Sequence, residues 1–523
     1  MKAFSVAAGI LLAGCIGWPV AAQAAESGAI GIEEVVVTAR RREETAQSVP
    51  IPVTAMTGEE LKDRVANDLT DLTRITPNMD YQKSASNRGT AQVFLRSIGQ
   101  VNWSPTQDPK VGIYLDGVYL GRPQGSVFDI MDVDRIEVLR GPQGSLFGRN
   151  TTAGLVHIIT RKPEDEFAAE VQVGGGNDGQ INAGAVINIP ITDTLATRVS
   201  IQHRESDGYV KNVGAGKDWN DENSQLVRAS ALWTPTDTFD ALLSFDYQRV
   251  RERSGLGSCE WAGPEDGAET LLQGGLPFIA YIFGVYDDVA AACNDTSAYR
   301  SDENDPDKAT LDAWGVNLTV NWDWDFATLT SITSYRDMED FNGSWGWASD
   351  KVGTPSYLEV IGIRDNESDQ FSQELRLSGS SDSLDWVVGA YYFDEQSINY
   401  LDVPLFRGVQ APDCADWPLF CFPVAPGLTL GDIALATQLL GSRSQTLNGE
   451  NSSAAVFGEV TWRFAEGWAV TAGARYSEDD RKFTRSQVLT VGINDPTLVC
   501  PDGSAPIGGT TCRVKKKFDE ITP

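Results

Sequence analysis

Charged side chains interrupt the apolar segments in the first third of this 523-residue chain. Arginines and carboxylates form ion pairs and charge-assisted hydrogen bonds when their surroundings exclude water, and five are candidates here: Arg96, Asp116, Glu137, Arg140 and Arg149. Alternate side chains of a strand share a face, so Ile136 and Val138 are expected to face a core and Glu137 to face away from it. We expect Glu137 to form ion pairs with nearby arginines.

Residue types for enzyme chemistry are scarce. The chain has two histidines, His157 and His203, which lie far apart in the sequence, and no nucleophile motif or metal-ligand cluster accompanies either. Each is expected to be a structural residue of a strand. The sequence therefore predicts no enzyme activity, no metal site and no cofactor. The formal charge of −31 also argues against nucleic acid as a partner, because binding it needs a basic surface.

Six of the seven cysteines fall in pairs within three long segments between expected strands. Pairing within a segment is the easiest geometry in a chain that leaves the reducing cytosol, although other connectivities are possible. The expected disulfides join Cys259 with Cys293, Cys414 with Cys421, and Cys500 with Cys512. A metal cluster is the weaker alternative, because no histidine lies near these cysteines and no Cys-x-x-Cys pair occurs.

Two kinds of segment must position these residues. Between residues 111 and 163, short β-prone runs alternate with glycine-rich turns, which is typical of a small compact domain. Upstream, Thr57 and Glu60 fit a helix capping box, and Leu61, Leu69 and Leu72 suit apolar helix faces. From about residue 166, alternating runs joined by short turns and long polar loops indicate membrane strands. The predicted fold class is mixed: a small α+β plug domain followed by an antiparallel transmembrane β-barrel.

Two motifs of the small domain resemble the plug of TonB-dependent outer-membrane receptors. They are DRIEVLRGPQGSLFGRNTTAG at residues 134–154 and VGIYLDGV at residues 111–118, and the resemblance extends over the whole chain. It implies a signal peptide at residues 1–24, a periplasmic tail at 25–44, a plug domain at 45–163 and the N-terminal part of the barrel at 164–523. We count about 11 or 12 strands, whereas plugged transporters have about 22, so we expect the chain to be C-terminally incomplete.

The tail carries a run that resembles the family's TonB box, the segment grasped by the energy-coupling protein TonB: Glu33, Glu34, Val35, Val36, Val37, Thr38 and Ala39. Such a β-branched run in a mobile tail can add to a partner's sheet through main-chain hydrogen bonds. The alternative is that it forms the first strand of the plug. In the leader, Cys15 is an alternative site of lipid attachment, although the apolar run continues to a second cleavage site at residues 22–24.

The resemblance implies a transporter in the Gram-negative cell outer membrane. It would import a scarce nutrient such as a ferric siderophore, cobalamin or an oligosaccharide, with the TonB complex, outer-membrane lipid and the ligand as partners. The plug ion pairs then either help to gate the pore or act as fixed salt bridges. A ligand-sensing receptor or adhesin without transport, and a non-functional truncated receptor, remain as alternatives.

Overall fold

The computed structural model describes residues 35–522, apart from residues 43, 65, 67, 85–88, 101–103, 127–130, 213–217, 254–299, 302–307, 344–345, 350–357, 362, 408–422, 426–427, 430–441 and 490–510. The predicted signal peptide, Cys15, Glu33, Glu34 and five of the six paired cysteines lie outside the described residues. Cys512 is described and is disulfide-bonded. Its predicted pairing with Cys500 stays a prediction.

The plug is built on a five-stranded sheet in the order β3 (Val53–Thr57), β9 (Val133–Arg140), β10 (Gly154–Thr160), β7 (Val111–Leu115) and β8 (Val118–Tyr119). Strand β10 runs antiparallel to β9 and parallel to β7. Ile136, Val138 and Val156 are completely buried in the core on one side of this sheet. The glycine-rich breaks read from the sequence are the turns between these strands.

Two short helical segments and a second small sheet complete the plug core. Helix α1 (Gly58–Asp63) has the expected capping box, in which Thr57 and Glu60 bond to each other's backbone N–H groups. The second segment is a 3-10 helix, η1 (Leu69–Arg74), and Leu61, Leu69 and Leu72 are all completely buried. Strands β4 (Met79–Lys83), β5 (Ala91–Leu95) and β6 (Ile98–Gly99) form the second sheet. No helix of the described part of the chain is both long and apolar enough to cross a membrane.

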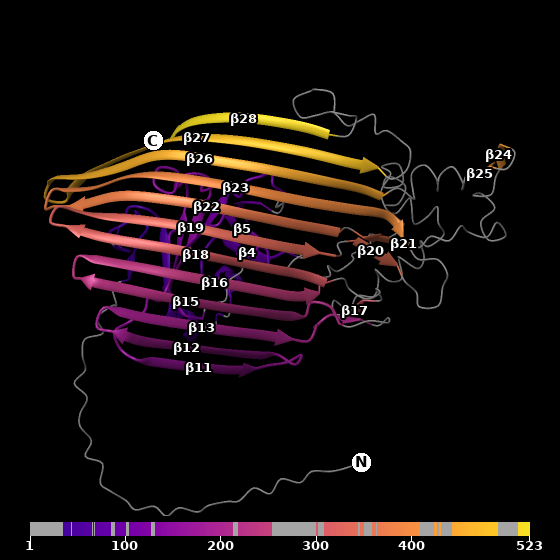
Figure 1. Cartoon of the computed structure of the whole chain (residues 1–523), viewed down its shortest axis with the longest axis horizontal. Coiled ribbons are helices and arrows are strands. Elements are labelled where there is room, and N and C mark those ends of the chain that lie inside the picture. The colour runs from indigo at the N-terminus through magenta and orange to yellow at the C-terminus, as the bar shows by residue number, and fades with distance from the viewer. Residues whose placement is uncertain are drawn as a thin grey trace, which may run out of the picture. The chain divides into compact units, whose positions relative to one another are not determined.

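Twelve long strands, each antiparallel to the next, form the barrel sheet in chain order (Figure 1). The strand number and direction confirm the predicted fold class. The strands are β11 (Ala168–Gly175), β12 (Ile181–Thr192), β13 (Leu195–Ser206), β15 (Glu222–Thr236), β16 (Phe239–Arg253), β18 (Lys308–Trp324), β19 (Ala327–Asn342), β22 (Ile363–Ser380), β23 (Leu384–Arg407), β26 (Ser442–Ala465), β27 (Trp468–Leu489) and β28 (Thr511–Thr522). Shorter strands in the tail and loops are β1 (Val36–Val37), β2 (Glu44–Thr45), β14 (Lys211–Asn212), β17 (Arg300–Ser301), β20 (Gly346–Ser349), β21 (Leu358–Ile361), β24 (Pro423–Ala425) and β25 (Leu428–Thr429).

The barrel strands are polar on the inside and apolar on the outside. In β16, Leu243 is 49% exposed, whereas its neighbours Ser244 and Asp246 are 4% and 6% exposed. At the ends with short turns, exposed aromatic rings contact one another, as Trp462 does with Phe464 at 5.5 Å between ring centroids. An apolar outer band with aromatic ends is the pattern of a sheet whose outer face meets lipid.

Candidate functional site

The segment that resembles the TonB box is folded against the plug. Val36 and Val37 form β1, which pairs antiparallel with Glu44 and Thr45 of β2. Val37 is completely buried, and Ala39 is 1% exposed. The expectation of a mobile tail is therefore wrong for residues 35–39, which we call the box segment, because alternate side chains of this short hairpin pack into an apolar cluster with plug and barrel residues.

Glu137 of β9 binds the box segment. The backbone N–H of Thr38 donates to its Oε1 at 2.8 Å, and the Thr38 hydroxyl donates to the same oxygen at 3.2 Å. The Arg135 guanidinium pairs with it from the plug side, with Nε 2.9 Å from Oε1. Burial raises the pKa of the Glu137 carboxyl above its ordinary value, although the Thr38 N–H and Arg135 favour the charged form.

Glu137 faces away from the core that buries Ile136 and Val138, as expected, but its side chain is nevertheless completely buried. Strand alternation does place it on the opposite face from Ile136 and Val138. That second face is also covered, however, because the box segment packs onto it. A pattern of alternate residues identifies the two faces of a strand but not how many of them are covered.

His157 of β10 lies beside the same carboxylate. Its Nε2 accepts a hydrogen bond from the Gly117 N–H at 3.0 Å, so the proton of the neutral ring sits on Nδ1. Nδ1 lies 3.4 Å from the Thr38 hydroxyl and 4.0 Å from Glu137 Oε2. Burial, with Arg41 nearby, holds the pKa of His157 well below its ordinary value. The ring is thus a neutral hydrogen-bonding partner in a polar cluster that surrounds Thr38.

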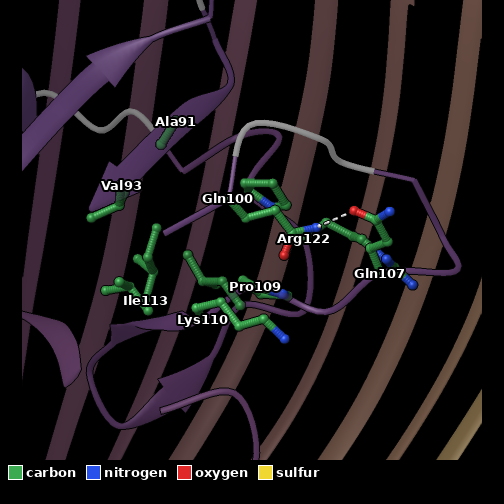
Figure 2. A pocket seen from close by; sticks show the side chains of 11 residues that line it. Ala91, Val93, Gln100, Gln107, Pro109, Lys110, Ile113 and Arg122 are labelled. Carbon is green, nitrogen blue, oxygen red and sulfur yellow. Dashed lines mark hydrogen bonds between the residues drawn. The ribbon is translucent and has the colours of Figure 1, made fainter. Parts of the chain in front are cut away.

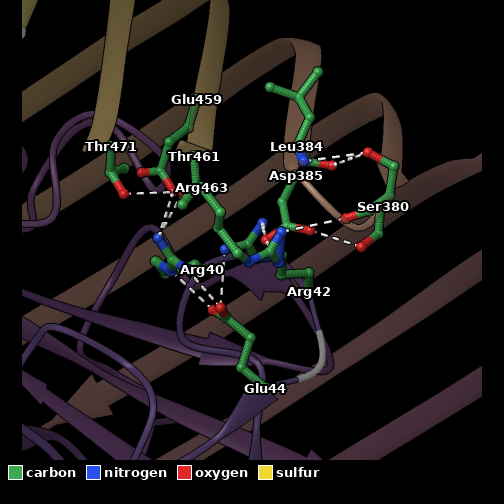
Figure 3. Close-up of polar contacts among 11 residues, drawn as sticks. Arg40, Arg42, Glu44, Ser380, Leu384, Asp385, Glu459, Thr461, Arg463 and Thr471 are labelled. Atoms are coloured by element: carbon green, nitrogen blue, oxygen red, sulfur yellow. Dashed lines mark hydrogen bonds and ion pairs between the residues drawn. The ribbon is translucent and has the colours of Figure 1, made fainter. Parts of the chain in front are cut away.

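Three consecutive arginines, Arg40, Arg41 and Arg42, follow the box segment; we call them the arginine triplet. Arg40 donates from Nε to Glu44 Oε2 at 2.8 Å and from Nη1 to Glu459 Oε1 at 3.3 Å. Arg42 bridges Glu44 at 2.9 Å and Asp385 at 3.1 Å. Figure 3 shows these side chains converging from the hairpin and from the barrel strands.

Arg41 contacts a different set of residues from Arg40 and Arg42. Its Nη2 lies 3.1 Å from Glu374 Oε2, and both side chains are 5% exposed. Its guanidinium also stacks over the ring of Phe147 at 4.3 Å and over that of Tyr114 at 5.5 Å. Buried guanidinium groups that are paired and stacked in this way fix the geometry of the chain that carries them.

The barrel partners of the triplet lie on three neighbouring strands. Glu374 belongs to β22, Asp385 to β23 and Glu459 to β26, and each lies within a few residues of a short turn. We call these three carboxylates the acidic wall patch. The box segment is thus tied both to the plug sheet and to the short-turn end of the barrel wall.

Two parts of this chain match models of known protein families. The family model of the TonB-dependent receptor plug domain matches residues 45–155, and that of the TonB-dependent receptor-like β-barrel matches residues 268–498. Together the two matches cover well over half of the chain. The chain belongs to the TonB-dependent receptor family. Proteins of this family are β-barrels of the cell outer membrane, which is where the receptor belongs.

The relatives of the receptor include the vitamin B12 transporter BtuB of Vibrio vulnificus, which is 25% identical over 199 residues, 37% of this chain and 32% of that protein. The pesticin receptor of Yersinia pestis is 28% identical over 191 residues, 35% of this chain and 27% of that protein. By name, the first is a transporter and the second a receptor, and neither is named as an enzyme. These alignments span about a third of the length of each relative.

Solved structures share the fold of the receptor. The ferric yersiniabactin uptake receptor FyuA from Yersinia pestis has a TM-score of 0.65 at 16% identity, and the match covers 91% of this chain and 61% of that chain. The ferric-catecholate import receptor Fiu from E. coli K12 has a TM-score of 0.64 at 15% identity, covering 91% of this chain and 67% of that chain. At these identities the likeness shows the fold alone.

The other predicted plug residues of the receptor lie in different surroundings. Asp116 pairs with Arg228 of β15 and accepts from the Thr160 N–H at 2.8 Å. Arg149 pairs with Asp108 at 3.4 Å and stacks over Phe393 of the barrel wall.

Arg96 and Arg140 are not among these paired residues. Arg96 is exposed with a φ of 52°, and Nε of Arg140 is buried without a hydrogen-bond partner among the described residues. Neither arginine has a carboxylate within salt-bridge distance in the described part of the receptor. Whether any of the five residues contributes to gating stays a prediction.

One plug–barrel contact of the receptor was not expected from the sequence. Arg122 donates from Nε and Nη2 to the two oxygens of Glu395 at 2.6 and 2.7 Å, and both side chains are buried. Beside it, Gln370 accepts from the Gly121 N–H and donates to the Tyr119 carbonyl, each at 2.8 Å. Residues 121–125 are among the glycine-rich turns expected between residues 111 and 163, but no local pattern relates them to a glutamate 273 positions from Arg122.

A pocket of the plug opens beside Arg122. It is lined on one side by polar groups, among them Gln100, Gln107 and Lys110, and on the other by apolar residues such as Val93 and Ile113 (Figure 2). Glu395 lies ten positions beyond Asp385 on β23, so this pocket is displaced from the arginine triplet toward the long-loop end of the receptor.

The two histidines lie in different surroundings. His157 is committed to the box-segment cluster, and His203 of β13 lies half-exposed with Nε2 3.4 Å from Glu205. In the part of the receptor that the structure describes, no three His, Cys, Asp or Glu side chains are grouped to hold a metal ion.

Proposed function

We propose that the receptor imports a scarce nutrient across the outer membrane, and that TonB drives this import by pulling on the box segment. The observation that carries the proposal is the docking of residues 35–39 on Glu137, at the short-turn end of the barrel. These short turns are the periplasmic ends of outer-membrane barrels. A partner anchored in the inner membrane would therefore reach the molecule from this side.

The box segment also has the right chemistry for such a partner. Its β-branched residues already adopt extended structure in β1, so little rearrangement is needed for it to pair with a strand of another protein. Undocking must come first, since Val37 and the Thr38 N–H are engaged with the plug. We infer that coupling requires an exchange of the Glu137 contacts for contacts with TonB.

The ligand would bind on the opposite side of the plug, near the pocket beside Arg122. Among the named relatives, BtuB transports vitamin B12, and FyuA and Fiu take up ferric complexes. We propose that this receptor also takes up a scarce nutrient of this kind. A ferric siderophore, cobalamin and an oligosaccharide are the candidates to test. The polar lining at Gln100, Gln107 and Lys110 supplies hydrogen-bond donors for a polar ligand.

The experiment is uptake of radiolabelled cobalamin, ferric siderophores and oligosaccharides by cells that express the receptor, with and without TonB. Deletion of residues 33–39 is the matched variant. We expect one ligand class to accumulate only when both TonB and the box segment are present, while binding at the cell surface persists without them. Surface binding with no TonB-dependent accumulation would instead establish a sensing receptor or adhesin.

A further inference from the structure

We propose that the arginine triplet is a force-bearing latch, which diverts a pull on the box segment into the barrel wall until its ion pairs break. The inference rests on the proposed function only in that TonB supplies the pull. It concerns Arg40, Arg41 and Arg42, and the acidic wall patch of Glu374, Asp385 and Glu459.

The order of attachments along the chain carries the argument. A pull applied before residue 35 meets the Thr38 contacts with Glu137 first and the triplet next. Only beyond Thr45 does the chain reach β3, the first strand of the main plug sheet, which pairs with β9. About ten residues separate Arg42 from Val53, and a chain of that length extends to about 33 Å. Tension therefore reaches β3 only after the triplet has left the wall.

The wall can bear such a load because its strands are continuously bonded. β22 pairs with β23 over 18 residue pairs and β23 with β26 over a still longer ladder. The triplet attaches to all three of these strands, so no single strand carries the tension alone. A plug that was attached only to itself would start to unravel under the same pull.

The electrostatics favour attachment that is strong yet reversible. The triplet faces four carboxylates, those of the acidic wall patch and Glu44, while Arg376 and Arg463 also neutralise Glu374 and Asp385. Burial alone would lower the pKa of Arg40, but Glu44 and Glu459 raise it on balance. Side chains that are charged, little exposed and paired separate only at a large cost in free energy.

The test uses variants of the wall, so that the segment seen by TonB is unchanged. Glu459→Gln removes the charged barrel partner of Arg40, which keeps its hydrogen bond to Thr461. Glu374→Gln and Asp385→Asn remove the partners of Arg41 and Arg42, and all three substitutions together make the triple wall variant. Glu170→Gln is the matched control, because Glu170 also ties the barrel to the plug, through Lys62 at 2.6 Å, but in an exposed pair far from the triplet in sequence.

The first readout is trypsin cleavage after Arg40, Arg41 and Arg42 in purified receptor held in nanodiscs, with no TonB and no ligand. We expect slow cleavage in the wild type and a rise of about tenfold or more in Glu459→Gln, as befits loss of one partner of a buried pair. Glu170→Gln should cleave like the wild type. Equal cleavage rates in wild type, Glu459→Gln and the triple wall variant would overturn the proposal.

The second readout is single-molecule pulling from the N-terminus of the same samples. We expect an early rupture event, before the plug sheet extends, that weakens in Glu459→Gln and is lost in the triple wall variant. Extension of the plug at the wild-type force in every variant contradicts the latch. Neither readout needs TonB, so failure of TonB-dependent uptake with these results intact would refute the proposed function and leave the latch in place.

Discussion

We expect Glu137 to control how often the box segment becomes accessible, so Glu137→Ala should release this segment. The substitution removes the charge-assisted hydrogen bond from the Thr38 N–H, at 2.8 Å, and the weaker bond from the Thr38 hydroxyl. A hydrogen bond to a charged group contributes about 1.5–3 kcal/mol and a neutral one about 1 kcal/mol. The raised pKa of Glu137 shows that burying its charge has a cost, which the substitution removes. We therefore expect a net loss of about 2–3 kcal/mol in docking free energy.

The assay is maleimide labelling of Val37→Cys, because the side chain at position 37 is completely buried when the segment is docked. If labelling requires opening, a loss of about 2–3 kcal/mol raises its rate roughly 30- to 150-fold. Glu137→Gln keeps an acceptor for the Thr38 N–H. Its labelling rate should therefore lie between that of Glu137→Ala and that of the parent, which is the receptor with Val37→Cys alone. Thr38→Val, which keeps the backbone bond, should raise the rate only about fivefold.

The reasoning fails if the labelling rate of Glu137→Ala is within about twofold of the rate of the parent, because loss of a hydrogen bond to a charged group should change the rate by more than that. It also fails if Thr38→Val has the larger effect, because the hydroxyl rather than the backbone N–H would then be the main attachment. A completely unfolded variant is recognised by near-ultraviolet circular dichroism and is not counted.

Three further predictions concern the plug. Arg122→Gln leaves Glu395 buried without its charged partner, so we expect a loss of about 3–5 kcal/mol in the stability of the plug–barrel contact, measured as a lower unfolding temperature and as entry of large antibiotics. Thr57→Ala removes the cap of α1 and should cost about 1 kcal/mol by denaturant titration. Burial raises the pKa of Glu137 above 4.5, so the folded plug binds the proton more tightly than the unfolded chain. As pH rises from 4.5 through the folded-state pKa, wild type should lose stability relative to Glu137→Gln, and a pH-independent difference would contradict this.

The sequence predicted most of the fold because its signals are local. The alternating runs and short turns expected from about residue 166 are present: in β16, Leu243 lies outside and Asp246 inside, and residues 193–194 and 466–467 form short turns between strands. The capping box of α1 was likewise complete within four residues. Each of these features depends on neighbours in the chain, and so each could be read without knowing which strands meet.

The candidate site was only partly predictable, because its contacts join distant parts of the chain. The box segment was recognised by residue type, yet Thr38 binds Glu137 across 99 positions and Arg40 reaches Glu459 across 419. The arginine triplet was not singled out, although its three cations are adjacent in the sequence. Its partners could not be predicted, because any of many inward-facing carboxylates in the barrel strands could have been opposite it.

Two of the ion pairs that tie the N-terminal part of the chain to the barrel wall lie on the same strand, β23. Asp385 binds Arg42 near the short turn of β23, while Glu395 binds Arg122 ten positions further along the same strand. At about 3.3 Å per residue the two pairs are roughly 30 Å apart along the strand. Their breakage can therefore be independent, since neither pair shares a side chain with the other. A pull from the short-turn end loads Arg42 first and reaches Arg122 only through the intervening plug strands. The segment between the two arginines is itself tied to the wall, by Asp68 to Arg204, by Asp108 to Arg481 and by Asp116 to Arg228, so these pairs must also break before it is displaced.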